Sequence, residues 1–349
     1  LLRICGIAAL GGILFGYDTA VISGAIEALK TYFNLSPAET GWAVSNVVIG
    51  CVVGAFAAGP LAARWGRKKA LMLAALLFTV SAVGAALAPT FTWFVIYRII
   101  GGLAVGIAAT VSPMYMSEVS PKDMRGRALS MQQFAIVFGQ IVIFYVNFKI
   151  ASLASEAWLV EMGWRWMFAS GVIPCILFCI LVFVIPESPR WNVMMGRDDQ
   201  ALAMLTKVSN AAHAQNLLKE IKDSLQQDQQ QRHRKLNYGD VRVRFILFVG
   251  CMIAMLQQVT GVNVMMYYAP VVLKTVTENA QEALFQTIWI GVLQLVGSVI
   301  GAMLMDRMGR IPLMRYGTLG AIAGLLLTSY ALYTQATGYF ALFGMLFFM

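Results

Sequence analysis

Apolar segments long enough to cross a lipid bilayer recur along nearly the whole chain. At about 1.5 Å per residue, an α-helix of roughly 20 residues spans a hydrocarbon core of about 30 Å. We find nine such segments, at residues 4–29, 42–62, 70–88, 92–117, 127–149, 165–185, 244–273, 282–305 and 312–334. Hydrophobic residues make up 59% of the sequence and charged residues 12%. The sequence therefore predicts an all-α membrane protein, because helices satisfy their own backbone hydrogen bonds in lipid.

The two ends of the sequence indicate a longer protein. A tenth apolar segment opens near Gly338 and stops at Met349, which provides about 18 Å of helix where about 30 Å is needed. The chain also begins at Leu1 rather than at a methionine, so we expect it to be a fragment. The first apolar segment is too long for the core of a secretion signal and has no cleavage site, so we expect it to stay in the membrane.

Positive charge is distributed as membrane topology requires. The net charge is +9, but most of the 26 Lys and Arg residues lie in alternate loops, after the second, fourth, sixth and eighth apolar segments. A nucleic-acid-binding protein would gather them on one surface, so we expect no nucleic-acid partner. By the positive-inside rule these loops are cytoplasmic, which predicts a cytoplasmic N-terminus and a lipid bilayer around the helices.

One long polar segment divides the chain. From Arg190 to Val243 the composition becomes charged and Gln-rich, and apolar residues recur at helical spacing in 202–208 and 217–225. This pattern predicts short amphipathic helices on the cytoplasmic side. The stretch QQDQQQRHRK that follows them (226–235) is typical of a solvated linker.

A short internal repeat predicts two halves. The sequence RWGR (64–67) follows the second apolar segment and RMGR (307–310) follows the eighth, at an offset of 243 residues. Because each follows the second helix of its half, we expect parallel repeats of six helices and a total of twelve spans. The predicted parts are a six-helix half at residues 1–189, a cytoplasmic linker at 190–243, and a truncated second half at 244–349.

Neither metal binding nor catalysis is indicated. The five cysteines fall within apolar segments, which favours small core residues over disulfides. Cys175 and Cys179 share a helix face, but both His residues lie in the polar segment, so we expect no metal site. The predicted spans hold no His and no pairing of a nucleophile with a base, so we expect neither an enzyme nor a cofactor.

Two charged residues lie deep within predicted spans. Asp18 belongs to the first span and Arg98 to the fourth. Charges inside a bilayer are costly, so each is expected to have a partner or a function. The pair could be a static ion pair that fixes helix packing. Alternatively, a carboxyl group whose distance from a guanidinium changes with conformation can bind and release a proton, and so couple to a proton gradient.

Amide side chains recur in the fifth predicted span. Gln133, Gln140 and Asn147 follow one another at seven-residue intervals. Seven residues are about 20° short of two full helical turns, so the three amides are predicted to form one stripe. Each amide could instead form hydrogen bonds between helices. Gly102 and Gly106 in the fourth span have the spacing of small residues that allows close helix packing.

The seventh predicted span carries a polar group around Gly261. Its members are Gln257, Gln258, Asn263, Tyr267 and Tyr268. On an unbroken helix, Gln258 and Asn263 would point about 140° apart, so their convergence requires the helix to unwind at Gly261. Amides both donate and accept hydrogen bonds, which suits vicinal hydroxyl groups, and an aromatic ring such as Phe15 can pack on a sugar's C–H face. These spans therefore favour an uncharged sugar as ligand.

Longer motifs are similar to those of the sugar-porter family of the major facilitator superfamily. They are FGYDTAVISG from Phe15, YRIIGG from Tyr97, PESPRW from Pro186, QQVTGVNVMMYYAP from Gln257 and DRMGR from Asp306. The resemblance is strongest to the family's bacterial proton symporters for D-xylose, with those for galactose and arabinose near. It implies a major facilitator fold of two six-helix halves, a monomer in the bacterial inner membrane, and sugar transport by alternating access.

The resemblance also implies roles for individual residues. Gln140, Gln257, Gln258 and Asn263 would bind sugar hydroxyls, with Tyr267 and Tyr268 closing over the site. Asp18 with Arg98 would handle the proton, and Asp18 favours symport because the family's passive facilitators carry Asn there. Six residues would form ion pairs that close the cytoplasmic side: Arg64, Glu118, Arg125, Glu187, Asp306 and Arg310.

Three positions depart from the family pattern. Ala63 replaces the usual Asp of the loop motif, so the first-half gate must use other partners. Gly171 stands where the xylose symporter has a second membrane carboxylate, which weakens the choice of xylose against galactose. Gln294 replaces the usual Asn in the sugar pocket. A pentose or hexose symporter, D-xylose first, is therefore expected, and a passive sugar uniporter or a sugar sensor with the porter fold stay open as alternatives.

Overall fold

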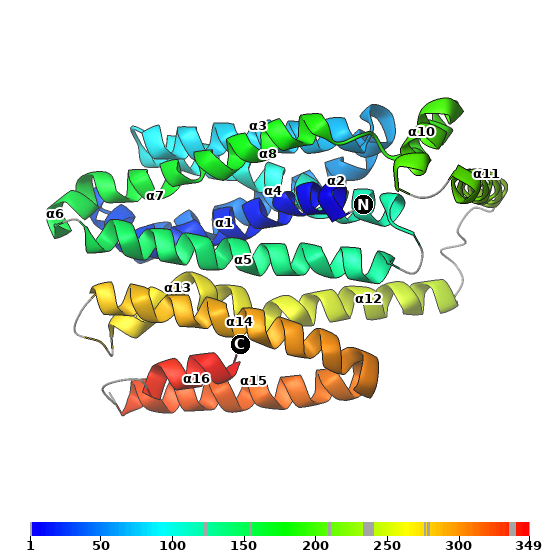
Figure 1. Cartoon of the computed structure of the whole chain (residues 1–349). Coiled ribbons are helices and arrows are strands. Elements are labelled where there is room, and N and C mark those ends of the chain that lie inside the picture. The colour runs from blue at the N-terminus through cyan, green and yellow to red at the C-terminus, as the bar shows by residue number, and fades with distance from the viewer. Residues whose placement is uncertain are drawn as a thin grey trace. The chain divides into compact units, whose positions relative to one another are not determined.

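Nearly all of the described chain is helical. The computed structural model describes residues 2–121, 124–153, 155–208, 211–232, 241–275, 277, 280–334 and 340–348. Its helices are α1 (Leu2–Tyr32), α2 (Pro37–Trp65), α3 (Arg67–Leu87), α4 (Phe91–Val119), α5 (Arg125–Ser152), α6 (Glu156–Trp158), the π-helical turn η1 (Leu159–Gly163), α7 (Trp164–Ser170), α8 (Val172–Val184), α9 (Pro189–Met194), α10 (Asp198–Val208), α11 (Ala211–Arg232), α12 (Val241–Val259), α13 (Val262–Lys274), α14 (Ala280–Met308), α15 (Arg310–Tyr333) and α16 (Phe340–Phe348) (Figure 1).

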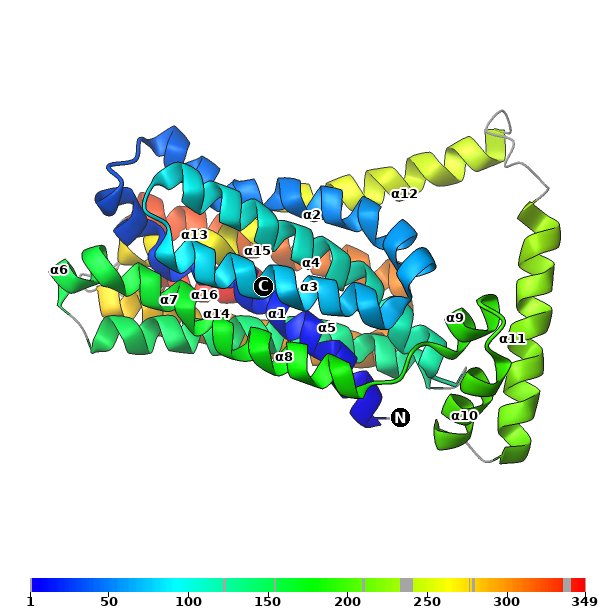
Figure 2. The same ribbon diagram turned by 90° about the horizontal axis from the view of Figure 1, so that it is seen from above.

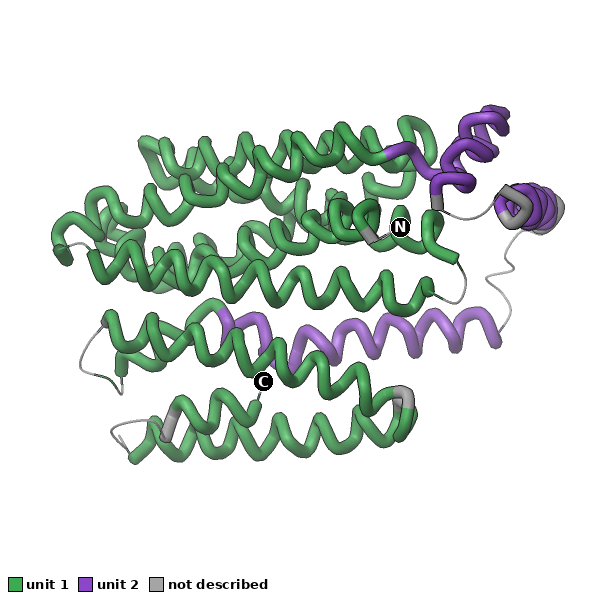
Figure 3. Tube along the Cα trace, viewed as in Figure 1, with its two compact units in different colours: residues 1–185, 267–349 green, residues 186–266 purple. Residues whose placement is uncertain are grey.

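The helices form two units. The first contains Leu1–Ile185 and Tyr267–Met349, and the second contains Pro186–Met266 (Figure 3). The predicted boundaries after residues 189 and 243 stay predictions. In the first unit the long helices lie side by side with nearly parallel axes (Figure 2).

The predicted membrane spans are confirmed in number. Among the described residues, nine helical segments are long and apolar enough to cross a membrane. The sixth, Glu156–Val184, begins nine residues before the predicted start at 165, because α6 and η1 extend it. The seventh, Val241–Lys274, is divided between α12 and α13. The predicted start of a tenth span, Gly338, lies outside the described residues, and α16 follows it.

Helix α1 holds the first unit together because it contacts both α4 and α5. Glycines permit this closeness: a Cβ on Gly16 would lie 1.9 Å from the carbonyl oxygen of Ile136 on α5. Close backbone contact is the main attraction available in lipid, where apolar burial does not drive helices together. The side chains of α1 are accordingly mostly buried, whereas α2 exposes large apolar side chains such as Phe56, as a helix that borders lipid does.

Four glycines bring α2 and α4 together. Cβ atoms on Gly50 and Gly54 of α2 would lie 2.1 and 2.3 Å from backbone oxygens of α4. Those on Gly102 and Gly106 of α4 would lie 2.1 and 2.2 Å from backbone oxygens of α2. The packing role predicted for Gly102 and Gly106 is therefore confirmed, and α2 supplies a matching pair of glycines that the sequence analysis did not single out.

The internal repeat has one backbone geometry in both copies. Gly66 of RWGR has φ 93° and ψ 163°, and Gly309 of RMGR has φ 81° and ψ 168°. Each ends a long helix, α2 or α14, and the next helix begins at the following residue. A positive φ strongly favours glycine, so the repeated sequence encodes a repeated turn.

The second unit contains the predicted amphipathic helices. α10 and α11 cover the two stretches predicted, and they contact each other and α9, which the sequence analysis did not predict. Lys222 on α11 forms an ion pair with Asp198 at 2.5 Å. The stretch predicted as a solvated linker begins as helix, since α11 continues through Arg232, and Gln226 and Gln227 within it are exposed. Gln and Arg are good helix formers, and no Gly or Pro interrupts the stretch.

The glycine contact between α2 and α4 can be tested by adding one methyl group. Gly102→Ala would place a Cβ atom 2.1 Å from the carbonyl oxygen of Val47, so the two helices must separate. Overpacking of this kind costs about 1–3 kcal/mol, and we expect a lower midpoint of thermal unfolding for the purified protein. Gly41→Ala on α2 is the control, because no heavy atom lies within 4 Å of its added Cβ. Equal midpoints for both variants would contradict the packing role.

Candidate functional site

A buried ion pair joins α1 and α4. Arg98 Nη1 donates to Asp18 Oδ2 at 3.0 Å and to the Asp18 backbone oxygen at 3.1 Å. The Arg98 side chain is 1% exposed and that of Asp18 is 14% exposed. Gly101 lies one turn after Arg98 on α4, and a Cβ there would lie 2.4 Å from Ser81 Oγ on α3, so its glycine allows α3 and α4 to pack closely beside the pair. The partnership predicted for Asp18 and Arg98 is thus present, whereas its role in proton transfer stays a prediction.

The guanidinium of Arg98 keeps hydrogen-bonding capacity beyond this pair. Its Nε and Nη2 atoms are buried and have no hydrogen-bond partner among the described residues. The ring centroid of Phe168 lies 5.6 Å from the guanidinium carbon. Next to Asp18, a cavity of about 20 Å³ is lined by Tyr17, Phe168 and Gly171, among others. That volume is enough to hold one water molecule beside the carboxyl group.

Two amide side chains of the first unit lie at the same position along the helix axes, which we call one level. Contacts join Ala151 to Gln281, Phe148 to Phe285, and Phe144 to Gly291, so α5 and α14 run antiparallel. This register brings Gln140 and Gln294 to one level, and the amide oxygen of each is buried without a hydrogen-bond partner among the described residues.

The same level includes the ion pair. The backbone nitrogen of Gln140 would lie 3.1 Å from a Cβ on Gly16 of α1, two residues before Asp18. Phe15, the aromatic residue proposed from sequence, is half-buried on the same turn of α1. Unsatisfied amide oxygens beside a buried ion pair are suited to bind a polar, uncharged ligand.

The predicted stripe on α5 does not share one environment. Gln133 is exposed, while Asn147 is buried and donates to the backbone oxygen of Val21 on α1 at 3.3 Å. Asn147 therefore serves helix packing, the alternative that the sequence left open. Gln132, which the sequence analysis passed over, is buried against Gly12 of α1. Adjacent glutamines differ by about 100° around a helix, and the sequence alone does not show which one faces α1.

In the second unit, the helix breaks where the sequence predicted. Gly261 has φ +82° and separates α12 from α13. Across this break, Asn263 Nδ2 donates to Gln258 Oε1 at 2.9 Å, so the predicted convergence of these two amides is confirmed. Gln257 and Gln258 are exposed within this unit, as is Asn263. Their role in binding stays a prediction.

Further along α13, Tyr267 and Tyr268 are half-buried. They follow Asn263 by one turn of the helix and a little more, so α13 carries both the predicted amide and the predicted closing tyrosines.

The cytoplasmic ion pairs differ in detail from those expected. Glu118 Oε1 pairs with Arg67 Nη2 at 2.6 Å, with both side chains more than nine-tenths buried. Arg64 is exposed and shows no ion pair within the described residues. Arg125 Nε donates to the backbone oxygen of Ser117 at 2.9 Å, and Glu187 in the second unit accepts from its neighbour's backbone N–H at 2.9 Å.

The side chains of Asp306 and Arg310 lie outside the described residues. The first-half partner of Glu118 is Arg67, which follows Gly66 at the start of α3, rather than Arg64 at the end of α2.

Membrane-spanning helices that place unpaired amides and the buried Asp18–Arg98 ion pair at one level are typical of a membrane transporter of the major facilitator class. A family profile described as "Sugar (and other) transporter" matches residues 4–349. The chain belongs to this family. It is not an enzyme family, and the fold is the all-helical major facilitator fold.

Curated relatives support the same assignment. The chain is 42% identical to the D-xylose-proton symporter of Escherichia coli K12, over 98% of this chain and 74% of the relative. It is 36% identical to the arabinose-proton symporter of Bacillus subtilis, over 95% and 71%. Identity to the galactose-proton symporter of Escherichia coli K12 is also 36%, over 92% and 68%.

Solved structures match over nearly the whole chain. A partially occluded inward-open conformation of the Escherichia coli xylose transporter XylE superposes with a TM-score of 0.90 at 40% identity, covering 99% of this chain and 83% of that one. The proton:xylose symporter XylE bound to 6-bromo-6-deoxy-D-glucose superposes with a TM-score of 0.86 at 42% identity, covering 99% and 78%.

The ion pair of Arg67 and Glu118 should matter more for stability than the exposed Arg64. Arg67→Gln removes the cation that compensates the nearly buried carboxylate of Glu118, and breaking such a pair costs about 3–5 kcal/mol. Arg64→Gln changes an exposed side chain and should stay within about 0.5 kcal/mol. Thermal unfolding of the two purified variants measures the difference. If Arg64→Gln lowers the midpoint of thermal unfolding more than Arg67→Gln does, the gate residue predicted from the sequence, Arg64, is the more important one.

Proposed function

We propose that this protein imports a neutral sugar together with a proton by alternating access. The observation that carries the proposal is the Asp18–Arg98 ion pair, which lies at the level of the amides of Gln140 and Gln294. A proton-binding group and sugar-binding groups at one level can respond to each other. The relatives at 36–42% identity are proton symporters for D-xylose, arabinose and galactose, which supports the same class of substrate here.

The proton step follows from the chemistry of the pair. In general, a guanidinium beside a carboxyl group favours the charged carboxylate, and burial without such a cation favours the neutral acid. If the inward and outward conformations differ in the distance between Asp18 and Arg98, Asp18 takes up a proton in one and releases it in the other. Sugar binding and protonation together then favour the conformation that opens inward.

Sugar binding is assigned to two groups of side chains. Gln140 and Gln294 supply amides from the first unit, with Phe15 as an aromatic surface. From the seventh span come Gln257, Gln258 and Asn263, with Tyr267 and Tyr268 closing over the bound sugar. D-xylose is the first choice of substrate. The proposed proton site has one carboxyl group, that of Asp18, with Gly171 near it. This arrangement is also compatible with a galactose-type symporter.

The proposed setting is a bacterial inner membrane with the N-terminus in the cytoplasm. Positive residues in the loops after α2, α4 and α8 support this orientation. We propose a monomer of two six-helix halves, with residues 1–189 as the first, 190–243 as a cytoplasmic linker and 244–349 as part of the second. Glu118, Arg125, Glu187, Asp306 and Arg310 belong to the proposed cytoplasmic gate, with Arg67 in addition to Arg64.

Asp18→Asn should uncouple sugar movement from the proton gradient. The amide keeps the size and a hydrogen bond to Arg98 but cannot carry the proton. Uptake of D-xylose, arabinose, galactose and glucose is measured in cells or proteoliposomes with an imposed proton gradient. We expect accumulation of the transported sugar to be lost while exchange across the membrane is retained. If Asp18→Asn still concentrates sugar against a gradient, Asp18 is structural and the protein's coupling lies elsewhere.

Gln140→Ala should weaken sugar binding, whereas Gln133→Ala should not. Both changes remove an amide from α5, but only Gln140 lies at the level of the ion pair, and Gln133 is exposed. Losing a hydrogen bond to a buried amide costs about 1–3 kcal/mol, which corresponds to a rise in KM of about 5- to 150-fold. The KM for exchange of D-xylose in proteoliposomes is the measurement. Equal effects of the two variants would remove Gln140 from the sugar site.

A further inference from the structure

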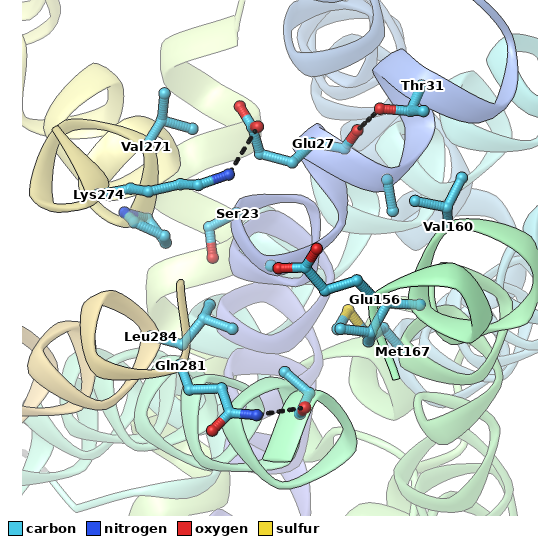
Figure 4. Close-up of a pocket in the computed structure, with 15 residues that line it drawn as sticks. Ser23, Glu27, Thr31, Glu156, Val160, Met167, Val271, Lys274, Gln281 and Leu284 are labelled. Atoms are coloured by element: carbon cyan, nitrogen blue, oxygen red, sulfur yellow. Dashed lines mark hydrogen bonds and ion pairs between the residues drawn. The ribbon is translucent and has the colours of Figure 1, made fainter. Parts of the chain in front are cut away.

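A second pocket lies in the first unit, away from the level of Gln140. It has a volume of about 310 Å³ and is formed by the C-terminal part of α1, by α6 and η1, by the end of α13 and by the start of α14 (Figure 4). The proposed topology places these helix ends on the outer side of the membrane. Along α1, Glu27 in this pocket is nine residues, or about 13 Å, beyond Asp18.

The polar groups of the pocket come from both proposed halves. Lys274 Nζ of α13 pairs with Glu27 Oε2 of α1 at 3.3 Å, and both side chains are about half exposed, at 46% and 52%. Glu156 turns its carboxylate toward the centre of the pocket (Figure 4) and has no hydrogen bond or ion pair among the described residues. Ser23 lines the pocket at 3% exposure and donates to the backbone oxygen of Ala20, which leaves its oxygen lone pairs to accept.

These groups limit the chemistry of a ligand. No group of three or more His, Cys, Asp or Glu that could hold a metal ion occurs among the described residues. An anion would meet two carboxylates and one ammonium that is already paired. A wholly apolar ligand would remove solvent from the carboxylate of Glu156 without giving it a partner.

A neutral polyol satisfies the same groups. A carboxylate accepts from two adjacent hydroxyls and an ammonium donates to a third, while the pocket's apolar residues Val160 and Leu284 can cover C–H surface. The volume is at the small end of pockets that bind small molecules, which suits a single sugar ring. Ion pairs between exposed side chains contribute little free energy, so sugar hydroxyls can replace the contact between Glu27 and Lys274.

We propose that this pocket is a second sugar-binding site of lower affinity, located at the outer entrance and separate from the amide site. The choice of a sugar over other neutral polyols rests on the proposed function. Glu156 is its principal hydrogen-bond acceptor, and Lys274 its principal donor. Sugar bound there holds substrate beside the entrance, and its hydroxyls take the place of the contact between Glu27 and Lys274.

The test measures equilibrium binding of radiolabelled D-xylose to the purified protein in lipid nanodiscs. In a background of Gln140→Ala with Asn263→Ala, which removes the proposed amide site, weak binding should persist. Adding Glu156→Gln should reduce that residual affinity at least tenfold, and so should Lys274→Gln on the opposite wall. Glu161→Gln, a carboxylate on η1 that does not line the pocket, is the matched control and should change nothing.

The outcomes separate this proposal from the proposed function. If residual binding is absent, or is the same in Glu156→Gln and Glu161→Gln, the outer site is overturned while the amide site can stand. If Gln140→Ala with Asn263→Ala leaves all binding intact and Glu156→Gln abolishes it, the outer site stands and the amide site fails. Binding of choline in place of D-xylose would show an organic cation site and overturn the assignment to a sugar.

Discussion

The ion pair between Asp18 and Arg98 is the interaction on which the arrangement of the first unit depends. Two charges inside a membrane are tolerated only when they are in contact, so α1 and α4 must meet at one register. The glycines of α1 that face α5 then bring Gln140 to the level of the pair. Since apolar burial contributes little to helix association in lipid, backbone contacts at glycines and this single pair decide which side chains share a level.

Signals of length and local geometry were readable from the sequence. The nine spans follow from the apolar segments, and the break in the seventh lies at Gly261, where the convergence of Gln258 and Asn263 requires it. The two RxGR motifs indicated a repeat, and the structure adds that both copies form the same turn. The sequence did not show which of two nearby residues of the same type makes a given contact. Gln132 rather than Gln133 faces α1, and Arg67 rather than Arg64 pairs with Glu118, because each depends on the rotation of one helix against another. No local pattern encodes that rotation.

The outer pocket was also beyond sequence reasoning, for a different reason. Its walls come from four places in the chain, near Glu27, Glu156, Lys274 and Gln281. Taken singly, none of these residues indicates a binding site. A charged residue near the end of a span is expected at the membrane surface, where it costs little. Only the antiparallel register of α5 and α14 and the contact of α1 with α13 bring these residues around one volume.

The two ion pairs on α1 suit opposite tasks in an alternating-access cycle. Glu27 and Lys274 are half exposed and join the proposed halves, so water can replace the contact at little cost when the outer side opens. Asp18 and Arg98 lie within the first half and are nearly buried, so separating them is costly unless the carboxyl group is neutralised. A proton on Asp18 would lower that cost, because it removes the negative charge that holds Arg98. A transporter with a weak pair at its entrance and a strong pair at its centre can therefore open readily to its substrate and still make the movement of the central pair depend on protonation.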